Sequence, residues 1–122
     1  ISDATYPSGG RVHPRVYGTS ARLIEKYVVQ ERVLTLEQAV HKVTGHAADR
    51  FGFEKKGVIA AGMDADLLLF SPENIHEQGT YARPNLPATG FDEVFVLGER
   101  VIENGVYRGG SSGEMLGARM GY

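Results

Sequence analysis

The stretch Gly57-Val58-Ile59-Ala60-Ala61-Gly62-Met63-Asp64-Ala65-Asp66-Leu67-Leu68-Leu69-Phe70 divides the chain into two parts of different character. Its two glycines can take a positive φ, so the backbone can turn tightly at both positions. The apolar run 67–70, bounded by Asp66 and by Ser71-Pro72, predicts a short buried strand. Helical and loop patterns precede this stretch, whereas strand and turn patterns follow it.

A loop and a helix are predicted at the start of the chain. Residues 3–18 have no hydrophobic period and contain two prolines and three glycines, which favours a loop. Thr19 or Ser20 can cap a helix that ends at about Gln30. Apolar residues recur on one face of its 3.6-residue period, namely Leu23, Ile24, Tyr27 and Val28.

A second helix is predicted to begin at Thr35. The sequence Thr35-Leu36-Glu37-Gln38 fits a capping box, in which the threonine hydroxyl and the glutamine side chain each bond the backbone of the other residue. Gly45 is expected to follow the end of this helix. One further helical turn is expected at 46–51, before Gly52.

Short strands are predicted in the second half, on either side of an irregular stretch at 71–92. Asn104-Gly105 is a strong signal for a two-residue hairpin turn, and a second turn is expected at Gly98-Glu99. The predicted strands are 67–70, 93–97, 100–102 and 106–107. Because so few short strands are marginal alone in water, the chain is expected to be part of something longer.

The composition excludes several classes of function. The net charge of −2 gives no electrostatic reason to expect nucleic acid or an anionic membrane as a partner. The absence of cysteine excludes disulfides, thiolate nucleophiles and cysteine-based zinc sites, and suits a reducing compartment such as the cytoplasm. No apolar run approaches the roughly 20 residues that a membrane span needs. The opening Ile1-Ser2-Asp3 resembles neither a native start nor a signal peptide.

Two candidates for chemistry lie in the first loop. Asp3 can act as a metal ligand or general base, or it can simply cap a turn. In His13-Pro14-Arg15, proline favours an extended conformation for His13 and presents Arg15 on a rigid stem. The Arg15 guanidinium can clamp a carboxylate with two parallel hydrogen bonds or form a surface salt bridge, and the residue pattern leaves both open.

Other candidates favour structural roles. His41 and His46 are five residues apart, whereas helical metal sites favour a spacing of four, so surface histidines are the preferred interpretation. Asp64 and Asp66 resemble a paired-carboxylate site, but they precede a strand at a position where turns favour aspartate. His76 supports nothing specific.

The chain also resembles a known family. Ser2-Asp3, His13-Pro14-Arg15-Val16-Tyr17-Gly18-Thr19 and the segment 36–52 are similar to the carboxyl-terminal part of N-acyl-D-amino-acid deacylases, which belong to the amidohydrolase superfamily. The segment 56–67 is similar to a glycine and Ala-Asp turn of the whole superfamily, and the likeness ends at 94–105. His-Pro-Arg-x-Tyr-Gly after Ser-Asp is the part that indicates the deacylase branch.

This resemblance implies an α/β fold built on a (β/α)₈ barrel with a small β-sandwich. Residues 1–56 would be the end of the barrel, with an active-site loop and the last helices. Residues 57–110 would be strands of the sandwich, and 111–122 an irregular tail. The fold would be incomplete on its own.

The resemblance also implies a reaction. The zinc ligands of such an enzyme would lie upstream of Ile1, and Asp3 would take a proton from the metal-activated water and pass it to the leaving amine. Arg15 would hold the free carboxylate of an N-acyl-D-amino acid. The segment alone would be inactive, and none of its own residues except Asp3 is a candidate metal ligand.

Two alternatives stay open. One is a related hydrolase with a cyclic amide substrate, such as a dihydroorotase or hydantoinase; Ala4 follows Ser2-Asp3 where the family usually has glycine, which leaves substrate choice open. The other is a non-catalytic interaction module whose exposed strand edges pair with another chain or a second copy.

Overall fold

A computed structural model describes residues 12–116 of the chain. These residues form two compact units: the first contains residues 12–34 and 70–90, and the second contains residues 35–69 and 91–116. In the described part, no helix has the length and apolar character needed to cross a membrane.

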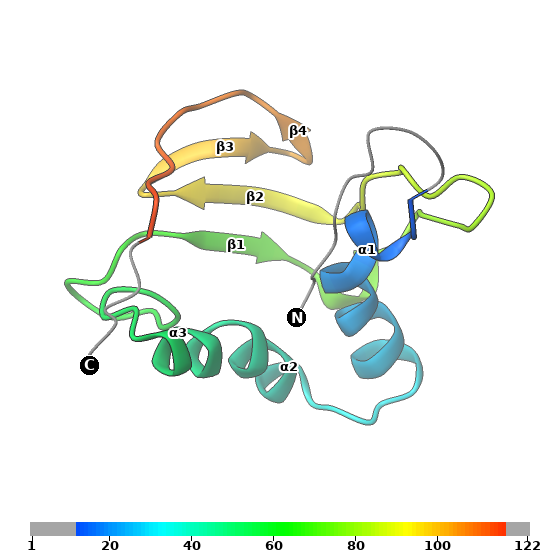
Figure 1. The fold of residues 1–122 in the computed structure, drawn as a ribbon, viewed down its shortest axis with the longest axis horizontal. Coiled ribbons are helices and arrows are strands. Elements are labelled where there is room, and N and C mark those ends of the chain that lie inside the picture. Colours follow the sequence, from blue (N-terminus) through cyan, green and yellow to red (C-terminus); the bar gives the residue numbers. More distant parts are fainter. Residues whose placement is uncertain (1–11, 117–122) are drawn as a thin grey trace. The chain divides into compact units, whose positions relative to one another are not determined.

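The first unit begins with one long helical segment. α1 (Arg15–Arg22) continues without a break into a π-helix, η1 (Leu23–Gln30), as Figure 1 shows in blue and cyan. The predicted end at Gln30 is confirmed, but the predicted cap at Thr19 or Ser20 is five or six residues too late, because the cap is Pro14 and residues 15–18 are not loop. The reason is Pro14, whose φ of −52° and ψ of −27° are already helical. A proline at a helix start loses no intrahelical hydrogen bond.

Residues 72–89 pack on this helix within the first unit. The 3₁₀-helix η2 (Pro72–Asn74) contacts η1, and His76 pairs with Thr89 in an isolated antiparallel bridge. Ile75, between these two features, is only 1% exposed, and it forms the buried core of this unit together with Ala21 and Ile24.

The second unit contains two helices, α2 (Leu36–Val43) and α3 (Gly45–Phe51). The predicted capping box is confirmed: the Gln38 N–H donates to Thr35 Oγ1 at 3.2 Å, and the Thr35 N–H donates to Gln38 Oε1 at 2.9 Å. Gly45 follows the helix end as predicted, but it continues directly into α3. The left-handed cap occurs later, at Gly52, with a φ of 71°.

The second unit also contains a four-stranded sheet in the order β1-β2-β3-β4 (Figure 1). Its last two pairings are antiparallel. The strands are β1 (Leu67–Phe70), β2 (Phe91–Val96), β3 (Glu99–Glu103) and β4 (Val106–Tyr107). The structure therefore confirms the predicted strands, although β2 covers 91–96 where 93–97 is predicted, and β3 covers 99–103 where 100–102 is predicted.

Two tight turns join the antiparallel strands. Asn104-Gly105 has φ values of 50° and 72°, which confirms the predicted hairpin turn. The other turn is at Leu97-Gly98, with φ values of 49° and 83°, because Val96 pairs with Glu99. The predicted position at Gly98-Glu99 is thus wrong by one residue. Leucine rarely takes a positive φ, and the contact that holds it there is described below.

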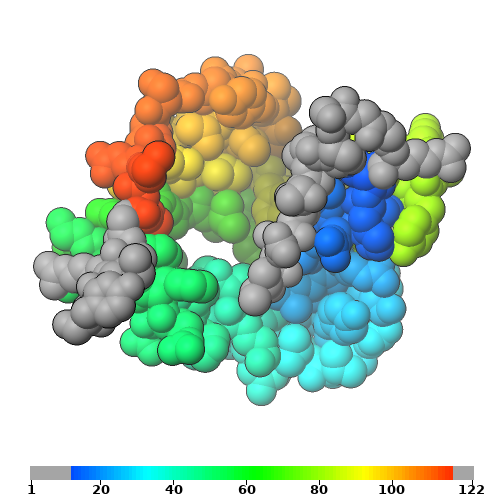
Figure 2. Space-filling model, in the orientation of Figure 1, coloured from blue at the N-terminus to red at the C-terminus, as the bar shows by residue number. Residues whose placement is uncertain are grey.

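Much apolar surface of the second unit is exposed. Leu68 and Leu69 of β1 are 56% and 61% exposed, so the prediction that 67–70 is a buried strand is wrong in its burial. The hairpin of β3 and β4 (orange in Figure 2) also presents Val106 and Tyr107 to solvent. Within the described residues nothing covers these side chains.

We expect Gly57 to be essential to the second unit. A Cβ at Gly57 would lie 2.7 Å from Ala48 Cβ, whereas a Cβ at Gly62 has no described atom within 4 Å, and both glycines have similar φ values of 87° and 85°. Gly62→Ala should therefore lower the free energy of unfolding by only about 1–2 kcal/mol, the cost of holding alanine in the left-handed conformation. Gly57→Ala adds overpacking and should cost roughly 2–5 kcal/mol in urea unfolding. Equal losses for the two variants would contradict this packing argument.

Candidate functional site

The two residues predicted to carry chemistry are Asp3 and Arg15. Asp3 lies outside the described residues, so its role stays a prediction. Arg15 is the first residue of α1 and is exposed. Its carbonyl accepts a hydrogen bond from Thr19 Oγ1 at 2.7 Å, four residues further along the helix. The predicted rigid stem for Arg15 is therefore a helix end.

The backbone N–H groups at the start of α1 are already satisfied. The Arg15 N–H donates to His13 Nδ1 at 3.1 Å, and the Val16 N–H donates to the His13 carbonyl at 3.1 Å. The Tyr17 and Gly18 N–H groups both donate to the Pro14 carbonyl. Helix N-termini often bind anions through free N–H groups. Here the N–H groups of residues 15–18 are bonded within the chain, so they are not available to an anion.

His13 also contacts a distant loop. Its Nε2 lies 3.0 Å from the Tyr81 hydroxyl, and the two rings meet edge to face with centroids 5.2 Å apart. Nothing in the sequence pattern indicates Tyr81, because it lies 68 residues away in an irregular stretch. The three residues His13, Arg15 and Tyr81 form a group that we call the helix-start cluster.

A second polar group joins η1 to the segment after η2. Glu25 Oε2 accepts from the Glu77 N–H at 2.7 Å, and Glu25 Oε1 lies 3.2 Å from His76 Nδ1. Arg22 donates to Glu77 Oε2 at 2.8 Å, and this carboxylate raises the pKa of Arg22. A Cβ at Gly18 would lie 2.7 Å from Glu77 Cγ, so a larger residue there would displace the Glu77 side chain. These contacts place His76 in a structural network, which the sequence did not indicate.

Asp64 and Asp66 share one cation. Lys56 Nζ lies 3.0 Å from Asp64 Oδ2 and also pairs with Asp66 Oδ2. The other oxygen of Asp66 accepts from the Leu97 N–H at 2.8 Å, and the Ala65 carbonyl accepts from the Gly98 N–H at 3.0 Å. Asp66 thus stabilises the left-handed Leu97-Gly98 turn. The preferred structural interpretation of this acidic pair agrees with these contacts.

The electrostatics of Asp66 follow from the same contacts. The hydrogen bond from Lys56 holds the pKa of Asp66 below its ordinary value of 3.8, and the Leu97 N–H lowers it further. In return, Asp66 and then Asp64 raise the pKa of Lys56. A carboxylate whose charged form is stabilised in this way is poorly suited to accept a proton near neutral pH.

This pKa shift predicts acid sensitivity. Because the pKa of Asp66 is lower in the folded state, its stabilisation is present above the ordinary carboxyl range and is lost as the pH falls through that range. Between about pH 5 and pH 3, the free energy of unfolding should therefore fall more steeply for the native protein than for Asp66→Asn. Asp49→Asn, at an exposed position on α3, is the control and should keep the native slope. Parallel slopes for the native protein and Asp66→Asn would contradict this assignment.

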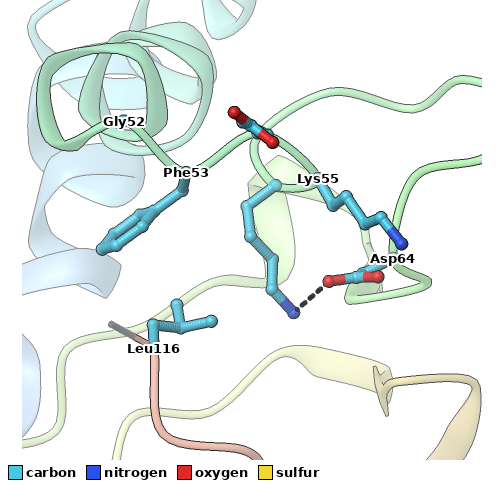
Figure 3. Close-up of a pocket in the computed structure, with 7 residues that line it drawn as sticks. Gly52, Phe53, Lys55, Asp64 and Leu116 are labelled. Carbon is cyan, nitrogen blue, oxygen red and sulfur yellow. Dashed lines mark ion pairs between the residues drawn. The ribbon is translucent and has the colours of Figure 1, made fainter. Parts of the chain in front are cut away.

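A cavity of about 240 Å³ lies beside the Lys56–Asp64 ion pair in the second unit. Figure 3 shows Phe53 and Leu116 on one side of it and the ion pair on the other. Its lining residues are Gly52, Phe53, Glu54, Lys55, Lys56, Asp64 and Leu116. Arg15 is not among them.

The described residues do not form a metal site. Between residues 12 and 116, no three histidine, cysteine, aspartate or glutamate side chains are grouped as a metal ion requires. His41 and His46 lie with their ring centroids 6.1 Å apart.

The chain is similar to several known proteins. Residues 3–102 match the model of the amidohydrolase family. An N-acyl-D-aspartate deacylase of Alcaligenes xylosoxydans xylosoxydans is 38% identical over 89 residues, which are 73% of this chain and 18% of that protein. A D-aminoacylase of the same organism is 36% identical over 110 residues, which are 90% and 23% of the two chains. A dihydroorotase of Lactobacillus johnsonii is 38% identical over only 55 residues, 45% of this chain and 13% of that protein.

The solved structures that match this chain are also of deacylases. One is a structure of D-aminoacylase that concerns the role of its binuclear metal centre. It is 35% identical to this chain and has a TM-score of 0.78, and the match covers 82% of this chain and 21% of that one. An N-acyl-D-glutamate deacylase of Bordetella bronchiseptica, complexed with zinc and a phosphonate inhibitor, is 38% identical with a TM-score of 0.73 over 75% and 19% of the chains. The chain thus shares part of the fold of these proteins and spans about a fifth of the length of the deacylases that it matches.

Proposed function

The chain belongs to the amidohydrolase family, and from this we propose that it is the carboxyl-terminal part of a zinc-dependent hydrolase of N-acyl-D-amino acids. The reaction cleaves a linear amide to a D-amino acid and a carboxylate. The observation that carries the proposal is the 36% identity to a D-aminoacylase over 90% of the chain. The described fold supports it, with a TM-score of 0.78 to the same kind of protein.

We further propose that the chain belongs to a (β/α)₈ barrel and a small β-sandwich. Residues 1–56 would close the barrel, and 57–110 would complete the sandwich. The exposed apolar residues of β1 and β4 support this arrangement, because large apolar side chains gathered at a surface usually mark a contact with another part of a protein. The isolated chain is accordingly expected to be inactive.

In this proposal the two predicted residues have separate tasks. Asp3 accepts a proton from the attacking water and delivers it to the leaving amine, as a positioned carboxylate can. Arg15 binds the substrate carboxylate with its planar guanidinium, which suits two parallel hydrogen bonds. Zinc, held by ligands outside residues 12–116, would supply an activated water in such an enzyme.

A cyclic amide is the second candidate substrate. The observation in favour of this candidate is the match to a dihydroorotase over 55 residues. That match covers less than half of the chain, whereas the deacylase matches cover 73% and 90%. A non-catalytic module is the third candidate, and the exposed apolar side chains of β1 and β4 are the observation in its favour.

The test is a stereoselective assay of the complete enzyme. N-acyl-D-amino acids should be hydrolysed and their L-enantiomers should not, and a chelator should abolish the activity until zinc is restored. Hydrolysis of dihydroorotate or hydantoin alone would instead favour the cyclic candidate. A complete protein that binds no zinc and forms a stable oligomer would favour the non-catalytic candidate.

A further inference from the structure

In the helix-start cluster, His13 makes contacts that have no role in the proposed reaction. His13 lies immediately before the buried Pro14 and two residues before Arg15. Both nitrogens of its ring are engaged, one with the Arg15 backbone and one with Tyr81. The histidine therefore joins the start of α1 to a loop far along the chain.

The two contacts define which nitrogen carries the proton. The Arg15 N–H can only donate, so His13 Nδ1 must accept and cannot itself carry a hydrogen. In the neutral ring the hydrogen is then on Nε2, which donates to the Tyr81 hydroxyl oxygen at 3.0 Å. This tautomer satisfies both contacts at the same time.

The loop that carries Tyr81 is held independently of His13. The Thr80 N–H donates to the Arg83 carbonyl at 3.1 Å, which closes a tight turn. Gly79 brings this turn close to α1, because a Cβ at Gly79 would lie 3.4 Å from Pro14 Cβ and 3.1 Å from the Pro84 carbonyl oxygen. The turn thus holds the backbone at Tyr81 close to Pro14, while the tyrosine itself is 74% exposed.

We propose that His13 is a positioning residue for Arg15, and that it fixes the guanidinium for binding of the substrate carboxylate. This inference rests on the proposed function. The His13 hydrogen bond holds the Arg15 backbone, and so fixes the point from which this long side chain, with about 2 kcal/mol of rotamer entropy, reaches the carboxylate. A carboxylate clamp that is misplaced by about 1 Å can cost up to 10²-fold in activity.

The test compares substrates with and without the carboxylate in the complete enzyme. His13→Ala should raise KM for an N-acyl-D-amino acid by about tenfold or more, with little change in kcat. For the corresponding N-acyl-D-amino acid carboxamide, which lacks the negative charge, His13→Ala should leave KM at the native value. A general loss of structure would instead affect both substrates.

Two further variants separate the two contacts of His13. Asparagine can accept from the N–H two residues ahead, so His13→Asn should restore most of the native KM. Tyr81→Phe keeps the ring but removes the hydroxyl, and it should raise KM less than His13→Ala. His46→Ala, at an exposed histidine of α3, is the control and should match the native enzyme.

The outcomes also distinguish this inference from the proposed function. If the native enzyme does not hydrolyse N-acyl-D-amino acids, both are wrong. If it does and Arg15→Ala raises KM while His13→Ala does not, only the role of His13 is wrong. Equal KM increases of His13→Ala on the carboxylate and carboxamide substrates would also overturn it. Far-ultraviolet circular dichroism of each variant checks that the helices are retained.

Discussion

Replacement of Asp3 by asparagine in the complete enzyme should lower kcat for N-acyl-D-amino acids by about 10²–10⁴-fold, the usual contribution of general acid–base catalysis. Asparagine has a similar size and can still accept hydrogen bonds, but it cannot take up the proton that the reaction must move. KM should change little, because the proposed role of Asp3 is proton transfer and not substrate binding. Steady-state kinetics with a saturating substrate measures this effect.

The control for Asp3→Asn is Asp49→Asn, which removes a carboxylate from an exposed position on α3. It should turn over substrate like the native enzyme. Native turnover by Asp3→Asn would show that another group moves the proton. It would leave the family assignment intact, since that rests on the whole segment 3–102.

Arg15→Ala should raise KM for N-acyl-D-amino acids by roughly 10²–10³-fold, since loss of one partner of a hydrogen-bonded charge pair costs about 2–5 kcal/mol. Arg15→Lys keeps the charge but loses the planar fork, and it should recover only part of this loss. Measured against the carboxamide substrate, both variants should resemble the native enzyme.

Arg50→Lys and Arg50→Ala, at the end of α3, are the matched controls for Arg15. They should change KM less than about twofold, as expected of surface charges. If the enzyme is instead a cyclic-amide hydrolase, Arg15→Ala should impair hydrolysis of the cyclic substrate. The same pair of variants therefore also discriminates between the two candidate reactions.

The features that could be predicted from the sequence have local causes. The capping box at Thr35, the Asn104-Gly105 turn and the strand at 67–70 each depend on residues a few positions apart. Propensity and turn chemistry act over this range, so a single sequence is sufficient to find them.

The features that were missed depend on distant partners or on rare backbone geometry. Tyr81 meets His13 across 68 residues, and Arg22 meets Glu77 across 55. The π-helix at 23–30 shows the same apolar period that predicts an α-helix, so the pattern does not distinguish them. Leu97 takes a left-handed conformation because a carboxylate 31 residues earlier holds its N–H. No property of Leu97 itself indicates this.

The contacts of Asp66 have a consequence for the order in which the chain folds. Its pairing with Lys56 spans 10 residues, whereas its hydrogen bond to Leu97 spans 31. Short loops close within about 10–100 ns, and the entropic cost of closure rises with loop length. Closing the Lys56–Asp66 contact therefore costs less chain entropy than closing the Asp66–Leu97 contact. The turn between β2 and β3 depends on a carboxylate 31 residues earlier, so it gains this hydrogen bond only when that longer loop has closed.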